Sequence, residues 1–180
     1  MIMNKTNRHV FLYDRILDPD VLEQLRLGMV FVAYGRISAQ MFNFYDQQEF
    51  HKVAVKIDAT TRPGTMRFVY GAIFALKYPE PSLVALDGYY GCSKARLGVN
   101  IPYDTYRRDE MGVQVIYPQT LRDIKSKTYL YGEVMPADVY LGNHNNEKVK
   151  YRINRRANRY PNGIDIDNFA KLFNKMRGEC

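Results

Sequence analysis

Residues 9–28, HVFLYDRILDPDVLEQLRLG, contain the start of the fold in a short space. His9–Tyr13 is an apolar run of strand-forming residues, which predicts a buried strand. Asp18 suits a helix N-cap, Pro19 suits the first helical position, and Gly28 can end a helix in a left-handed conformation. The stretch therefore predicts a strand, a tight loop and a short helix over residues 19–27.

Further strand-like runs follow this opening. Gly71 interrupts the most apolar of them, and a glycine there is typical of a bulge or of the close approach of another backbone. Pro79 and Pro81 can only open a helix, with Leu83, Val84 and Leu86 as its apolar stripe and an end near Gly88 and Gly91. Many strands with few helices predict a small α+β barrel or sandwich. The predicted strands are residues 29–37, 39–45, 52–57, 67–76, 112–117 and 127–135.

The C-terminal part of the chain differs from the rest in its sequence pattern. The turn-rich residues 141–146 predict a boundary between a domain of residues 1–146 and an extension of residues 147–180. Residues 149–153 alternate as in a half-buried strand. A final helix has one apolar face, which we expect to dock on the chain's own barrel, with pairing to a second copy as the alternative. That face carries Ile166, Phe169, Leu172, Phe173 and Met176.

The positive charge is concentrated in the same extension. The chain has a formal net charge of +7, and residues 147–180 contain nine Lys and Arg against four acids. Such asymmetry favours an anionic partner, with nucleic acid as one candidate, while a solvated strand face is the plainer interpretation. The candidate contacts are Lys148, Lys150, Arg152, Arg155, Arg156 and Arg159.

Composition narrows the class of protein. The chain of 180 residues has 25% charged residues, and its apolar runs are much shorter than a membrane span requires. Its two cysteines cannot form a disulfide framework, and no Cys/His pair has the spacing of zinc ligands. We therefore expect a cytoplasmic protein with no metal site, no cofactor and no membrane association.

Several motifs, in order, resemble the γ-glutamylcyclotransferase family. The loop Tyr13–Leu17 is similar to the family's Tyr-Gly-Ser/Thr loop after the first strand, and Ala85–Gly91 is similar to its Leu-Asp-x-x-Glu-Gly helix end. The resemblance extends over about residues 9–140 and implies a small mixed β-barrel with short flanking helices, followed here by a basic C-terminal extension. The other matching segments are Val69–Phe74, Tyr106–Arg108 and Thr128–Leu130.

The resemblance also implies a chemistry. Active members cyclise a γ-glutamyl group to 5-oxoproline, with a Glu as general base and loop N–H groups that hold the anionic end of the substrate. Here Tyr90 stands at the Glu position and Asp14 at the loop glycine. A phenol with an ordinary pKa near 10 is a poor base at neutral pH, and the Asp14 charge repels an anion unless Arg15 neutralises it.

Other acids are weak substitutes. Asp87 lies one helical turn before Tyr90 but belongs to the family pattern, where closing the helix explains it, and Asp14 is explained as a turn residue. The catalytic residue is therefore left unassigned. The residues that the resemblance places around the pocket, and that we expect to bind a ligand, are Tyr13, Asp14, Arg15, Ile16, Leu17, Tyr90, Tyr106 and Tyr129.

Three functions follow from these observations. The first is a protein of this fold that does not form 5-oxoproline and uses the pocket to bind a small, anionic molecule or a partner protein. The second is an active cyclotransferase-type enzyme with a substitute base. The third is a nucleic-acid-binding protein that acts through its basic tail.

Overall fold

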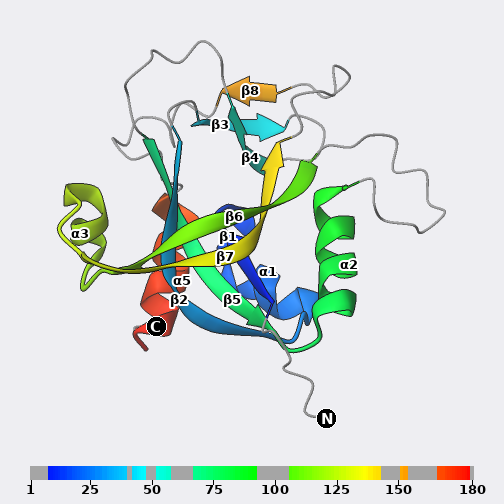
Figure 1. The fold of residues 1–180 in the computed structure, drawn as a ribbon, viewed down its shortest axis with the longest axis horizontal. Coiled ribbons are helices and arrows are strands. Elements are labelled where there is room, and N and C mark those ends of the chain that lie inside the picture. Colours follow the sequence, from blue (N-terminus) through cyan, green and yellow to red (C-terminus); the bar gives the residue numbers. More distant parts are fainter. Residues whose placement is uncertain are drawn as a thin grey trace.

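Five strands of the computed structural model close into a barrel in the order β1-β5-β2-β6-β7 (Figure 1). The structure describes residues 8–39, 42–47, 52–57, 67–92, 106–142, 151–153 and 166–178. β1 and β7 pair in parallel, whereas the other neighbouring strands pair antiparallel, so the barrel is mixed. The predicted α+β barrel is thereby confirmed. Its strands are β1 (His9–Leu12), β2 (Met29–Ala39), β5 (Arg67–Leu76), β6 (Tyr106–Tyr117) and β7 (Leu130–Gly142).

A second, smaller sheet lies at one end of the barrel, at the top of Figure 1. Its order is β4-β3-β8, with antiparallel pairing throughout. β4 (Lys52–Ile57) has the predicted bounds, and β3 (Phe42–Gln47) and β8 (Tyr151–Ile153) overlap their predicted runs. The predicted turn at residues 62–65 lies outside the described residues.

Short helices flank the barrel. They are η1 (Arg15–Leu17), α1 (Pro19–Leu25), α2 (Pro79–Tyr90), α3 (Leu121–Ser126) and α5 (Ile166–Met176). α1 begins as predicted, because the Oδ1 atom of Asp18 accepts a hydrogen bond from the backbone N–H of Asp20. It ends earlier than predicted, since Arg26, with φ of 47°, is its left-handed C-cap. Gly28 also takes the predicted left-handed conformation, with φ of 58°, two residues beyond this cap.

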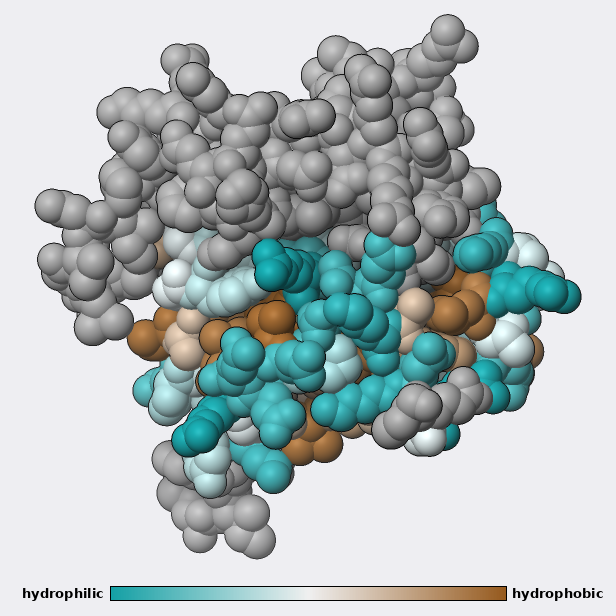
Figure 2. All heavy atoms as spheres, turned by 180° about the vertical axis from the view of Figure 1, so that it is seen from behind, coloured by the Kyte–Doolittle hydropathy of each residue, from teal (hydrophilic) through white to brown (hydrophobic). Residues whose placement is uncertain are grey.

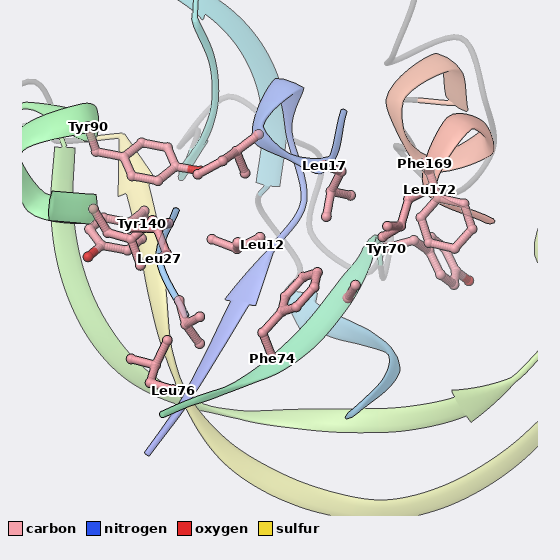
Figure 3. Packing of buried hydrophobic residues seen from close by; sticks show 14 of the residues in the cluster. Leu12, Leu17, Leu27, Tyr70, Phe74, Leu76, Tyr90, Tyr140, Phe169 and Leu172 are labelled. Carbon is pink, nitrogen blue, oxygen red and sulfur yellow. The ribbon is translucent and has the colours of Figure 1, made fainter. Parts of the chain in front are cut away.

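The core has two layers, and the side chains of successive β1 residues point alternately into one layer and the other. Phe11 points into the barrel and joins Ile73 and Val139 there. Val10 and Leu12 point outward into the layer between the barrel and the helices, which Figure 3 shows from close by. This outer layer contains the start of the candidate site, because the chain leaves β1 directly into the loop of residues 13–17.

Gly71 allows two backbones to approach. An ideal Cβ atom on Gly71 would lie 2.1 Å from the carbonyl oxygen of Leu12. A separation below 3 Å is not available to a real side chain, so the pairing of β1 with β5 requires glycine here. The predicted close approach of another backbone is confirmed.

Three sequence predictions differ from the structure. The polar segment before β7 forms α3, whose Thr120 and Asp123 make a reciprocal capping box. β6 and β7 are longer than predicted, because their mutual ladder continues through polar residues such as Arg108 and Asp138. Val84 is 50% exposed, so the buried stripe of α2 consists of Leu83 and Leu86 without it.

The C-terminal helix α5 packs on the barrel. Phe169 and Phe173 are buried, and their rings lie 5.5 and 5.3 Å from the ring of Tyr34 on β2. Lys171 also pairs with Asp18 at 2.5 Å. Apolar side chains of this face therefore contribute to the core, whereas Met176 is 44% exposed. The division at residue 146 and pairing with a second copy through this helix stay predictions.

Candidate functional site

The loop after β1 places a carboxylate inside the protein. Asp14 is only 1% exposed, and its Oδ1 atom accepts a hydrogen bond of 3.1 Å from the backbone N–H of Ile16. This contact caps η1, so the side chain turns into the loop rather than into solvent. Arg15, the next residue, is exposed.

The second residue of the site comes from the last turn of α2. The phenol of Tyr90 donates a hydrogen bond of 2.9 Å to Oδ1 of Asp14. α2 ends immediately after Tyr90, where Gly91 takes the left-handed conformation with φ of 70°. The loop and the helix end that the resemblance assigns to one pocket are thus brought together, with Asp14 and Tyr90 in direct contact.

Aromatic rings fill the space around this contact. The Tyr90 ring stacks on Tyr140, with 4.3 Å between centroids and 14° between planes, and lies 4.9 Å from the ring of Tyr106. Figure 3 shows Tyr90 extending from α2 above Tyr140. Tyr13, Tyr90, Tyr106 and Tyr140 are each buried, and so are Ile16 and Leu17. Of the expected pocket residues, Ile16, Leu17, Tyr90 and Tyr106 therefore belong to one buried cluster, whereas Tyr13 packs in the barrel interior.

Burial determines the protonation state of Tyr90. Burial first, and the nearby charge of Asp14 second, raise the pKa of Tyr90 well above its usual value near 10. Both causes disfavour the phenolate, because one removes water from the charge and the other repels it. At neutral pH Tyr90 is a hydrogen-bond donor, and it lacks the free base form that accepting a proton from an ammonium group requires.

Tyr140 is a site residue that our sequence reasoning missed. Its hydroxyl donates to Oδ1 of Asp87 at 2.7 Å, and its backbone carbonyl accepts a hydrogen bond from the hydroxyl of Tyr13. The predicted last strand ended at Met135, whereas β7 continues to Gly142. The apolar run Val139–Leu141 was the signal that could have extended the strand to Tyr140.

The Asp87 carboxylate is held by an ion pair and a hydrogen bond. Both of its carboxylate oxygens lie 3.0 Å from Nη1 of Arg108, and Oδ1 also accepts from Tyr140. Arg108 in turn lies 3.8 Å from Asp138, which pairs with Arg8 at 2.7 Å. The carboxylate thus fastens α2 to β6 and β7, while the backbone carbonyl of Asp87 accepts hydrogen bonds from Gly91 and Cys92 at the end of the helix.

Tyr129 makes its polar contacts with Tyr70 and Arg36. Its hydroxyl lies 2.6 Å from that of Tyr70 and accepts a hydrogen bond of 2.9 Å from Arg36. The Arg36 guanidinium lies over the rings of Phe68 and Tyr131, at 3.9 and 4.4 Å from their centroids. Tyr129 and Tyr90 both belong to the buried outer cluster, and the contacts that hold Tyr129 come from Tyr70, Arg36 and Tyr131.

Most of the basic residues of the C-terminal extension lie outside the described residues. Lys148, Lys150, Arg155, Arg156 and Arg159 lie outside the described residues, and Arg152 is located only as part of β8. Nucleic-acid binding through them stays a prediction. In the described ranges no three His, Cys, Asp or Glu side chains gather as metal ligands would, and no helix is long and apolar enough to cross a membrane.

Comparison with solved structures agrees with the barrel fold. No model of a known protein family matches the sequence, and no curated protein matches it. Among solved structures, a γ-glutamyl cyclotransferase superposes with a TM-score of 0.51 at 14% identity, over 93% of this chain and 86% of the other. An uncharacterised human protein superposes with a TM-score of 0.52 at 15% identity, over 94% and 88%.

This chain has the γ-glutamylcyclotransferase-like fold. The expected fold type is thereby confirmed along nearly the whole chain. At these identities the likeness concerns the fold, and activity has to be argued from the side chains in the site.

Proposed function

We propose that this chain is a γ-glutamylcyclotransferase-like protein that does not form 5-oxoproline and acts by binding. The observation that carries this proposal is the buried hydrogen bond from Tyr90 to Asp14. It joins the two positions at which the resemblance places the general base and the loop glycine.

The pair opposes both requirements of the cyclisation. Tyr90 is protonated at neutral pH, so it cannot remove a proton from the substrate ammonium. Asp14 accepts from the N–H of Ile16, a loop donor of the kind that the resemblance assigns to the anionic end of the substrate. The chain's own carboxylate occupies this donor, and its charge repels a second carboxylate.

The same pair limits what the inherited position binds. A ligand that enters there displaces the Tyr90 phenol from a buried carboxylate, so it must supply its own hydrogen-bond donor to Asp14. An ammonium or hydroxyl group of a small molecule meets this requirement, as does a side chain of a partner protein. The anionic end expected from the resemblance needs a location away from Asp14.

A second function, an active enzyme with a substitute base, is supported by one observation. Asp14 places a buried carboxylate oxygen 2.9 Å from the Tyr90 hydroxyl, which comes from the position that the resemblance gives to the catalytic Glu. A carboxylate there has the right chemistry to accept a proton from an amine. Turnover that depends on Asp14 separates this function from the first.

The experiment is a test for 5-oxoproline released from γ-glutamyl-amino acids and γ-glutamylamines. We expect no release above background from the natural chain, and release from the double variant Tyr90→Glu/Asp14→Gly if it folds, because the variant restores the base and removes the internal anion. Tyr117→Phe, at a half-exposed tyrosine, is the matched control. If the natural chain releases 5-oxoproline and Asp14→Asn abolishes this release, the first proposal is overturned in favour of the second.

The binding half of the proposal has its own measurement. Calorimetric titration of the natural chain with a γ-glutamylamine is expected to give heat of binding without turnover, and Asp14→Asn is expected to weaken binding by removing the negative charge that attracts the ligand's ammonium group. Absence of binding to every γ-glutamylamine, together with absence of turnover, would exclude a small-molecule ligand of this class and leave a partner protein as the occupant.

A further inference from the structure

An apolar hollow lies outside the barrel between α1, β2 and α5. Its volume is about 450 Å³, which is within the size range of sites for small molecules. Leu22 of α1 and Leu172 of α5 form two of its walls, and Phe31 and Phe74 line it from the barrel. The pair of Lys171 with Asp18 fastens α5 to the N-terminal end of α1, so both helices are held in place beside it.

Charged side chains lie among the residues that line this hollow. Arg26, Lys175 and Glu23 line it and are exposed, which places them toward its mouth. Within the described ranges no side-chain hydrogen bond or ion pair is found for Arg26 or Lys175, whereas Lys171 and Arg108 are paired with acids. Two cations and one acid, with a net positive charge, therefore surround an apolar interior.

We propose that this hollow binds a small amphipathic anion, with its apolar body between α1 and α5 and its single anionic head beside Arg26 and Lys175. The apolar walls favour transfer of a hydrocarbon or aromatic body from water. The two cations favour one negative charge at the mouth, where solvent keeps each contact modest. Figure 2, which views the molecule from behind, shows apolar patches framed by polar side chains on this side.

This site goes beyond the function proposed above, because it shares no lining residue with the Asp14–Tyr90 contact. The buried carboxylate of Asp14 disfavours an anion at the inherited position, whereas Arg26 and Lys175 favour one here. The two locations therefore differ in the charge that they select, and each can be removed without changing the other.

Calorimetric titration of the full chain with dodecanoate, dodecanol and dodecyltrimethylammonium, each below its micelle concentration, tests the proposal. We expect saturable binding of dodecanoate at one site and weaker binding of the cation. Arg26→Gln/Lys175→Gln is expected to weaken dodecanoate about five- to tenfold and to leave dodecanol unchanged. Met176→Trp, which enlarges an exposed side chain in the lining, is expected to weaken both.

The matched control is Arg122→Gln/Lys127→Gln. It also removes one Arg and one Lys from exposed positions, and Lys127 takes the same left-handed helix-end conformation as Arg26. Equal weakening of dodecanoate binding by the two double variants would overturn the proposal. Dodecanoate binding that is unchanged in both Arg26→Gln/Lys175→Gln and Met176→Trp would also overturn it. Sedimentation with phosphatidylglycerol vesicles, in the absence of any dodecanoate binding, would also overturn it by identifying the attraction as one to a membrane surface.

Discussion

Tyr140 of β7 stacks on Tyr90 of α2 with 4.3 Å between their ring centroids, and this contact connects two parts of the molecule. On one side, Tyr90 bonds Asp14 in the loop after β1. On the other, the Tyr140 hydroxyl bonds Asp87, which holds Arg108. The candidate site is therefore continuous with the polar contacts that fasten α2 to the barrel, so substitutions in one are expected to affect the other.

Removing the Tyr90 hydroxyl is expected to destabilise the protein. Tyr90→Phe keeps the stacked ring but takes a hydrogen bond from a buried carboxylate, which costs about 1–3 kcal/mol. Urea unfolding followed by circular dichroism measures the loss. Tyr117→Phe, at a half-exposed tyrosine, should change the free energy of unfolding by less than about 0.5 kcal/mol. Equal effects of the two substitutions would show that the Tyr90–Asp14 bond contributes nothing to stability.

Two glycines should respond in opposite directions to alanine. Gly71→Ala places a Cβ atom against the Leu12 carbonyl and is expected to cost at least about 3 kcal/mol. Gly88→Ala, in the interior of α2 with nothing within 4 Å of its ideal Cβ atom, is expected to stabilise by about 0.5–1 kcal/mol. Thermal unfolding of both variants checks the pair, and a neutral Gly71→Ala would contradict the close approach of β1 and β5.

Gly71 and the start of α1 illustrate how far the sequence could predict the fold. Gly71 within an apolar run indicated a close backbone contact, and Asp18-Pro19 indicated the start of α1, because both are local steric or hydrogen-bonding rules. The bond between Asp14 and Tyr90 depends on residues that are far apart in the sequence and meet only when the barrel closes. Tyr140 was missed for a related reason. Polar residues in β7 hide the strand pattern in the sequence, whereas pairing with β6 keeps these residues in a strand.

The C-terminal helix should contribute strongly to stability through its buried face. Phe169→Ala removes a fully buried ring beside Tyr34 and is expected to cost about 3–5 kcal/mol. Met176→Ala, on a side chain that is 44% exposed, should cost less than about 1 kcal/mol. Denaturant unfolding compares the two. If both had the same small effect, α5 would add little to the core of the barrel.

Stability is expected to fall at alkaline pH. Burial raises the pKa of Tyr34 to about 12, and burial followed by the charge of Asp14 raises the pKa of Tyr89 to about 12. The unfolded chain loses these protons near pH 10, so the stabilisation is complete below about pH 10 and is lost as pH rises from 10 toward 12. Urea midpoints at pH 8, 9.5 and 11 should decrease in the last step.

A spectroscopic control separates this effect from general alkaline damage. Tyrosinate absorbance of the folded chain should lag behind that of the urea-unfolded chain between pH 10 and 12. Tyr34→Phe keeps the ring contacts with α5 and should reduce the fall in urea midpoint over the same range. Superimposable titrations of the folded and unfolded chains would contradict the raised pKa values.

The bond between Tyr140 and Asp87 should show energetic coupling. Tyr140→Phe removes the donor, and Asp87→Ala removes the acceptor, so each single variant leaves a polar group with fewer partners. Because the residues touch, the double variant is expected to lose less than the sum of the single losses, with a coupling of about 0.5–3 kcal/mol. A matched cycle of Tyr140→Phe with Thr120→Ala, at the distant cap of α3, should be additive. Coupling of equal size in both cycles would mean that Tyr140 acts through the whole fold, and a larger coupling with Asp87 would locate the interaction in their hydrogen bond.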